Sequence, residues 1–127
     1  MASLVVDTVR AWHAAVNAGD LERLVALSSS DIEVAGPRGS GRGEQLLRDW
    51  FGRAGVRLEP LQTFSRDTVV VVEQRATWAS AEADSASAAR TVASVFSVAD
   101  GRVTSVMRYA DLASALEATG LTQSDRV

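Results

Sequence analysis

The sequence predicts a single α+β domain over residues 1–127, in which helices cover one face of a curved antiparallel sheet. Two amphipathic helices joined by a short turn open the chain, a strand-like run and a third helix follow, and four strand-like segments come next in succession. Consecutive strands with short connections pair as an antiparallel meander, and the apolar face of such a sheet needs a helical layer over it. Hydrophobic residues make up 46% of the 127 residues, which is enough for one domain with its own core.

The N-terminal helices are predicted from apolar periodicity and from the turn between them. Residues at spacings of four, three and four share one face of the first helix, over residues 4–18: Val5, Val9, Trp12 and Val16. Within the turn Asn17-Ala18-Gly19-Asp20, Gly19 suits the left-handed residue that ends a helix, and Asp20 suits the N-cap of a second helix to about residue 27. A third helix is predicted over residues 44–52.

The first strand is predicted over residues 31–35, before a glycine-rich loop over residues 36–43. Further strands are predicted over residues 56–64 and 68–79, the second of which opens with consecutive valines. The Ser/Ala-rich segment 80–89 is predicted to be a mobile hairpin loop.

The C-terminal part predicts a hairpin and a closing helix. Strands over residues 90–99 and 102–110 flank Asp100-Gly101, a dipeptide typical of tight hairpin turns. Asp111 suits the N-cap of a short helix that ends near Gly120, and residues 122–127 are predicted to fray.

Charge and composition narrow the possible partners. The net charge is -3, and a phosphate-binding surface needs a basic face, so we expect no nucleic acid partner. The chain has no cysteine and one histidine, which excludes thiolate and multi-histidine metal sites, and we expect no metal and no cofactor. No apolar run reaches membrane-spanning length and the N-terminus does not match a signal peptide, so we expect a cytoplasmic protein without membrane contact.

Three runs in this order resemble the nuclear-transport-factor-2-like superfamily, in particular its SnoaL-like bacterial members. They are Asn17–Leu21, residues 31–37 and residues 95–112. The resemblance implies a cone-shaped sheet covered by three N-terminal helices plus a short C-terminal helix, a ligand pocket, and a homodimer formed through the outer face of the sheet. The superfamily includes isomerases, cyclases, epoxide hydrolases, dehydratases and non-catalytic members, so the fold alone does not imply a reaction.

The ketosteroid isomerase pattern of this superfamily is not kept. That pattern has a tyrosine on the first helix, an aspartate base just before a proline and a second acid on the penultimate strand. The matching positions hold Trp12, Gly36 and Ser94. The base that shuttles the proton is therefore missing.

The limonene epoxide hydrolase pattern has an Asp-Arg-Asp trio with Tyr and Asn as water holders. Here the trio matches Glu73, Arg75 and Arg108, so its charges are inverted, and the water-holder positions hold Val34 and Gly36. Epoxide hydrolysis by that mechanism is not expected.

The inverted trio is the candidate catalytic cluster. Glu73 and Arg75 share one face of a strand because side chains alternate with period two. If that face lines the cone, Arg108 joins them, and two guanidiniums around one carboxylate suit a bound carboxylate or phosphate. Two alternatives stay open: an ion-pair network that only holds the sheet, or the opposite register, in which Gln74, Ala76 and Trp78 point inward.

Other residues are candidates for the wall of the pocket: Trp12, Arg38, Trp50, Phe51, Ser94 and Phe96. For each aromatic residue the alternative is ordinary core packing. His13 would need a carboxylate partner to act as a general base, and the alternative is a histidine that is exposed or whose hydrogen bonds are satisfied within its own helix.

These observations favour a small-molecule-binding SnoaL-like domain with a pocket for an unidentified polar or anionic ligand. An enzymatic variant of this hypothesis uses Glu73 in isomerase, cyclase or hydrolase chemistry, with the arginines stabilising negative charge. The alternative function is a non-catalytic homodimeric interaction module with a filled interior.

Overall fold

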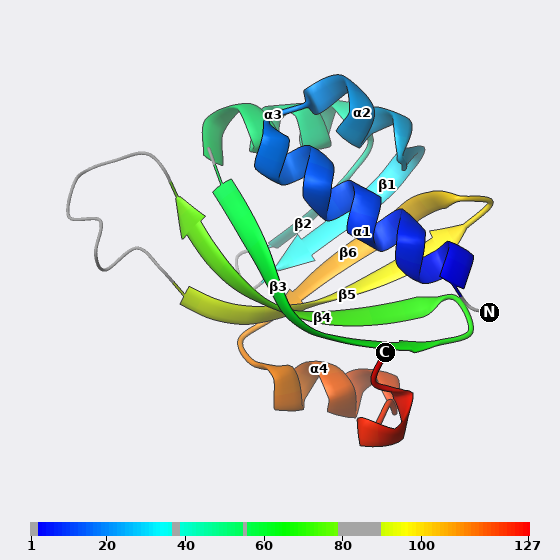
Figure 1. Ribbon diagram of the computed structural model, residues 1–127. Coiled ribbons are helices and arrows are strands. Elements are labelled where there is room, and N and C mark those ends of the chain that lie inside the picture. Colours follow the sequence, from blue (N-terminus) through cyan, green and yellow to red (C-terminus); the bar gives the residue numbers. More distant parts are fainter. Residues whose placement is uncertain (1–2, 37–38, 55, 79–89) are drawn as a thin grey trace.

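The computed structural model describes residues 3–36, 39–54, 56–78 and 90–127 (Figure 1). The segment 80–89, for which the sequence predicts a mobile loop, lies outside these residues. The helices are α1 (Ser3–Ala18), α2 (Leu21–Ala26), α3 (Glu44–Ala54) and α4 (Leu112–Thr119). The strands are β1 (Ser28–Gly36), β2 (Gly39–Arg42), β3 (Val56–Arg66), β4 (Val69–Trp78), β5 (Arg90–Ala99) and β6 (Arg102–Tyr109).

One six-stranded sheet runs in the order β2-β1-β6-β5-β4-β3. The predicted meander is confirmed for β3 to β6, which pair antiparallel in sequence order. The prediction of a wholly antiparallel sheet is wrong at one pair, because β1 lies parallel to β6. After β1 the chain forms the edge strand β2, passes through α3 and returns to the sheet at its opposite edge, β3. The meander then places β6 beside β1 in the same direction.

The glycine-rich segment holds a short strand where the sequence predicts only a loop. Residues 39–42 form β2, which turns back on β1 with Gly36 opposite Gly39 and Glu33 opposite Arg42. Glycine has a low strand propensity, so composition predicts a loop, but its backbone forms the same ladder of hydrogen bonds.

Helices lie on both faces of the sheet (Figure 1). We call the face that packs on α1 the inner face and the face that packs on α4 the outer face. The inner core includes Trp12, Val72 and Phe96, whereas the outer core includes Val71 and Ala115. The predicted α+β cone is confirmed, but α4 covers the face opposite to the N-terminal helices, because successive valines of β4 present apolar surface to both sides.

The helix N-caps and the tight hairpin turn lie where the sequence predicts them. Asp20 and Asp111 cap α2 and α4 by accepting hydrogen bonds from the backbone N–H groups of Arg23 and Ser114. Between β5 and β6, Asp100 and Gly101 both have positive φ, at 53° and 74°, which is the backbone of a tight hairpin turn. The predicted caps and this turn are confirmed.

Asn17 fixes the end of α1 to the edge strand β3. Its side-chain amide donates to the Leu58 carbonyl at 2.8 Å and its side-chain oxygen accepts from the Leu58 N–H at 2.7 Å. The side chain therefore pairs with the strand as a neighbouring backbone would. This holds the first helix over the inner face.

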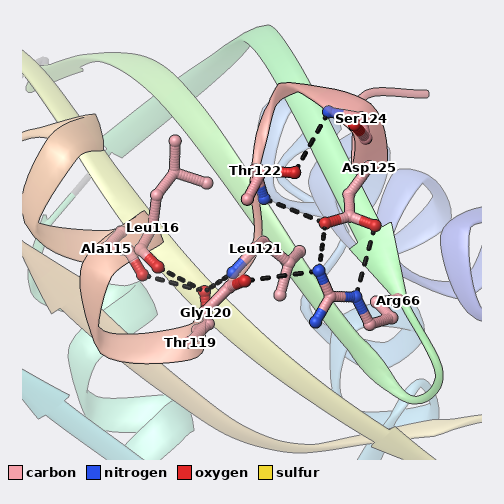
Figure 2. A network of polar contacts seen from close by, with 9 residues as sticks. All are labelled: Arg66, Ala115, Leu116, Thr119, Gly120, Leu121, Thr122, Ser124 and Asp125. Carbon is pink, nitrogen blue, oxygen red and sulfur yellow. Dashed lines mark hydrogen bonds and ion pairs between the residues drawn. The ribbon is translucent and has the colours of Figure 1, made fainter.

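The C-terminal segment is ordered, and the predicted frayed tail is wrong. Figure 2 shows Asp125 accepting hydrogen bonds from both Arg66 and the Thr122 backbone N–H. The Arg66 Nη2–Asp125 Oδ2 distance is 2.6 Å, and Thr122 caps a short 3₁₀ helix over Gln123–Asp125. Beyond it the Val127 N–H donates to the Thr63 carbonyl at 2.8 Å, so the tail pairs with the edge of β3.

Among the residues that the structure describes, no helix combines the length and hydropathy needed to cross a bilayer.

Candidate ligand site on the inner face of the sheet

The register of β4 decides which of the predicted trio reach the inner face. Gln74 and Ala76 are fully buried, and Ala76 belongs to the inner core. Because strand side chains alternate, Glu73 and Arg75 lie on the outer face with Val71. The expectation that both line the cone is therefore wrong, and the alternative register that points Gln74 and Ala76 inward is the one observed.

Glu73 and Arg75 have surface neighbours on the outer face. The Glu73 carboxylate accepts a hydrogen bond from the Gln62 amide of β3 at 2.8 Å. Arg75 is exposed and lies opposite Glu59 of the same neighbouring strand. The structure thus separates these two residues from Arg108, and the catalytic role assigned to the trio stays a prediction.

Arg108 lies on the inner face. It stands opposite Ser94 of β5, which in turn stands opposite the inner-core residue Val72. The side chain is partly buried, and this burial lowers the pKa of the guanidinium, which is still protonated at neutral pH. Within the described part of the chain, Arg108 has no hydrogen-bond or ion-pair partner.

Two arginines lie on the inner face of the described strands. Arg90, at the start of β5, lies on the same face as Arg108 because its neighbour across the ladder is Ala76, and it is exposed. The neighbours of each acidic residue along the described strands point inward, so the acidic side chains lie on the outer face. These residues are Asp31, Glu33, Glu59 and Glu73. No carboxylate of these strands therefore neutralises the two arginines from the inner face.

Next to Arg108 a chain of buried polar groups crosses from the sheet to α1. The Ser94 hydroxyl donates to Gln74 Oε1 at 2.8 Å, and Gln74 Nε2 lies 2.8 Å from His13 Nε2. His13 Nδ1 lies 2.8 Å from the Val9 carbonyl oxygen. A carbonyl only accepts, so Nδ1 carries the proton and Nε2 accepts from the Gln74 amide.

His13 is a satisfied, neutral histidine in this chain of bonds. Burial lowers its pKa, and the hydrogen bond to Val9 opposes that shift only in part. Of the predicted alternatives, a histidine satisfied within its own helix is confirmed for Nδ1. An exposed histidine is wrong, because the side chain is buried beneath the sheet-facing side of α1. The other nitrogen of His13 contacts an amide rather than the carboxylate that a general base would need.

The predicted aromatic walls are part of the packed core where the structure describes them. Trp12 is 2% exposed and Phe96 is fully buried, and their rings meet edge to face at 5.3 Å between centroids. The Trp12 indole N–H donates to the Ser28 hydroxyl at 3.0 Å, so this donor already has a partner. The side chains of Trp50 and Phe51, on α3, and the whole of Arg38 lie outside the described residues.

No metal centre is apparent in the same region. Among the described residues, no three or more histidine, aspartate or glutamate side chains gather so as to hold a metal ion.

Comparison with known proteins identifies the family. The model of the SnoaL-like domain matches residues 9–106, which is most of the chain. The chain belongs to the SnoaL-like domain family. The sequence matches none of the curated proteins with which it was compared.

Solved structures share the fold of this SnoaL-like domain. Bal32a, from a soil-derived mobile gene cassette, is 24% identical, with a TM-score of 0.74 over 85% of this chain and 89% of its own. TerC, co-crystallised with polyporic acid, is 18% identical, with a TM-score of 0.74 over 91% of this chain and 97% of its own. An NTF2-like protein of unknown function from Cytophaga hutchinsonii is 13% identical, with a TM-score of 0.74 over 88% and 94% of the two chains.

Sequence reasoning missed two residues that shape this SnoaL-like site. Gln74 is named only in the alternative register, and its bond to His13 joins residues 61 positions apart. Arg90 is named only as the start of a strand. On its own face of β4, Gln74 lies between the apolar residues Val72 and Ala76. This is a signal that could have directed attention to Gln74, since an uncharged amide on an apolar face needs a partner.

Proposed function

We propose that this SnoaL-like domain binds a small molecule with a polar or anionic group, and that Arg108 holds this group on the inner face of the sheet. The observation that carries the proposal is the partly buried Arg108 guanidinium, which has no partner among the described residues. The exposed Arg90 on the same face adds a second positive charge at the rim.

The energetic argument rests on desolvation. A guanidinium withdrawn from water without a counter-charge loses hydration free energy, and the lowered pKa of Arg108 reflects this loss. A carboxylate or phosphate that enters the site restores the lost interactions through charge-assisted hydrogen bonds. TerC, which has a similar fold, was co-crystallised with polyporic acid, and this supports a small-molecule ligand here as well.

The position of Glu73 favours binding over acid–base catalysis by the trio. Its carboxylate lies on the outer face and accepts a hydrogen bond from Gln62, so the sheet separates it from Arg108. A reacting group held at Arg108 would be out of hydrogen-bond reach of that carboxylate.

A thermal-shift and calorimetric screen tests the proposal with a matched pair of variants. The probes are small carboxylates, phosphates and sulfonates, including benzoate and inorganic phosphate. Arg108→Met and Arg75→Met make the same substitution on the inner and outer faces. We expect at least one anion to stabilise both the wild type and Arg75→Met, because a ligand of the native state raises the free energy of unfolding. In Arg108→Met we expect this stabilisation to be lost.

Two results would overturn the proposal. One is stabilisation that survives in Arg108→Met. The other is the absence of stabilisation by every anion in the screen.

The second candidate function is a homodimeric interaction module without a ligand. The filled core around Trp12 and Phe96 favours it, because these rings occupy interior space that a large ligand would need. We propose that the chain forms a homodimer in the bacterial cytoplasm through the outer face beside α4, where Met107 is 38% exposed. Sedimentation of the wild type and Met107→Glu tests this: a dimer that dissociates in the variant supports it, and a monomeric wild type refutes it.

A further inference from the structure

We propose that anion binding at Arg108 is coupled to the uptake of one proton by His13, through reversal of the hydrogen-bond chain that joins His13, Gln74 and Ser94. The inference rests on the proposed function, and it adds a residue on α1 that responds to the ligand without touching it. The class of ligand is an oxyanion with two acceptor oxygens, one for Arg108 and one for Ser94.

In its observed direction, the hydrogen-bond chain offers an anion an acceptor rather than a donor. The Ser94 hydroxyl donates inward to Gln74, so only the lone pairs of Ser94 Oγ remain for a ligand. Ser94 and Arg108 are neighbours across the ladder, at positions whose Cβ atoms lie roughly 5 Å apart in such pairs. An oxyanion on the guanidinium therefore meets the lone pairs of a buried hydroxyl.

Reversal of the chain removes this conflict without moving the backbone. A proton from solvent binds His13 Nε2, which then donates to Gln74 Oε1 once the Gln74 amide has rotated by half a turn. The amide nitrogen then donates to Ser94 Oγ, and the Ser94 hydroxyl proton is free to donate to the anion. The distances of 2.8 Å in the chain suit both directions, and the bond from His13 Nδ1 to Val9 is unchanged.

The charges around His13 make the anion the decisive partner. On the faces of the strands packed against α1, the charged groups are the cations Arg108 and Arg90. The charged residues of α1 and α2, and those described on α3, are exposed or engaged in surface ion pairs: Asp7, Arg10, Glu22, Arg23, Glu44, Arg48 and Asp49. On β3, Arg57 and Glu59 are exposed. Without a ligand, burial keeps the His13 ring neutral, whereas a bound anion favours its imidazolium.

Calorimetry of the wild-type protein with benzoate and with benzenesulfonate measures the coupling. Titrations at one pH in buffers of different ionisation enthalpy give the number of protons taken up. We expect about one proton per anion near neutral pH, with an affinity that rises by up to about tenfold for each unit that the pH falls. Benzenesulfonate stays ionised throughout, so any proton taken up with it binds to the protein.

His13 is the only histidine, so its ring resonances report its protonation directly. We expect the NMR shifts of a neutral ring in the free protein and of an imidazolium in the complex. His13→Gln should bind the same anions without proton uptake, and Arg75→Met on the outer face should behave as the wild type. If His13→Gln does not fold, the wild-type calorimetry and NMR still decide the question.

The outcomes separate this inference from the proposed function. Anion binding that needs Arg108 but takes up no proton, with a neutral His13 ring in the complex, overturns the coupling and leaves the proposed function standing. Binding of neither benzoate nor benzenesulfonate overturns the coupling, and if no other anion of the screen binds, the proposed function fails as well.

Discussion

Two polar networks of this protein use similar bond lengths in opposite surroundings. The inner network (Ser94, Gln74 and His13) is buried and uncharged. The C-terminal network (Arg66, Asp125 and Thr122) is charged, but the Arg66 side chain is 49% exposed. We infer from this comparison that burial, rather than formal charge, determines how much the free energy of unfolding falls when one residue of a network is removed. Water replaces a lost partner at the surface and cannot do so beneath α1.

The largest effect should come from the middle of the inner network. Gln74→Leu keeps the volume but leaves His13 Nε2 and the Ser94 hydroxyl without partners. We expect the free energy of unfolding to fall by about 2–4 kcal/mol, the cost of two unsatisfied buried groups, as measured by urea denaturation. The double variant Gln74→Leu with Ser94→Ala should recover part of the loss because it removes one unsatisfied group. A loss below about 0.5 kcal/mol would show that water reaches these groups.

The next prediction concerns pH, because the inner network contains a histidine and the C-terminal network does not. Burial holds the pKa of His13 below 6.5, the value of an ordinary histidine. Below that pH the unfolded chain binds a proton that the folded chain does not bind. The contribution of neutral His13 to the free energy of unfolding is therefore complete above 6.5 and falls as the pH drops toward the folded pKa. The slope should reach at most about 1.4 kcal/mol per pH unit. His13→Gln should remove this slope, and denaturation of both proteins between pH of about 7.5 and about 5.5 measures it.

The sequence predicted where helices, strands and turns lie better than it predicted which face of the sheet each side chain occupies. Asp20, Asp111 and Asp100-Gly101 act through neighbours in the chain, so their signals are local and proved correct. The four consecutive valines of β4 are apolar on both faces, which erases the alternation that fixes a register. The outer position of Glu73 therefore could not be derived from the strand itself.

The inner network and the place of α4 depend on long-range packing. The bond between His13 and Gln74 joins residues that only the completed sheet brings together. An amphipathic helix such as α4 indicates that one side is buried but not which face of the sheet it covers. The parallel pairing of β1 with β6 likewise follows from the route of the whole chain.

A smaller and local effect is expected from Arg66→Ala. The variant removes the hydrogen bonds to Asp125 and to the Gly120 carbonyl shown in Figure 2. Because water can replace them, we expect the urea midpoint to change little and the amide of Val127 to exchange faster as the tail leaves β3. Arg126→Ala is the matched control, since within the described residues its side chain has no partner and its backbone keeps the bridge to Phe64. Equal exchange in both variants would refute a role for Arg66 in docking the tail.

The smallest effect is the acid release of the same tail. The hydrogen bond from Arg66, followed by that from the Thr122 N–H, holds the pKa of Asp125 below 3.8. A lowered carboxyl pKa means that this stabilisation is complete above the ordinary value and is lost as the pH falls through the folded value. We therefore expect the Val127 amide to stay protected at pH 5, where His13 has already begun to weaken the whole fold, and to lose protection only in stronger acid. In Asp125→Asn the tail should exchange fast at every pH. Should the tail instead come loose together with the His13 transition, the two networks would form one cooperative unit, and the contrast between buried and exposed polar groups would not hold for this protein.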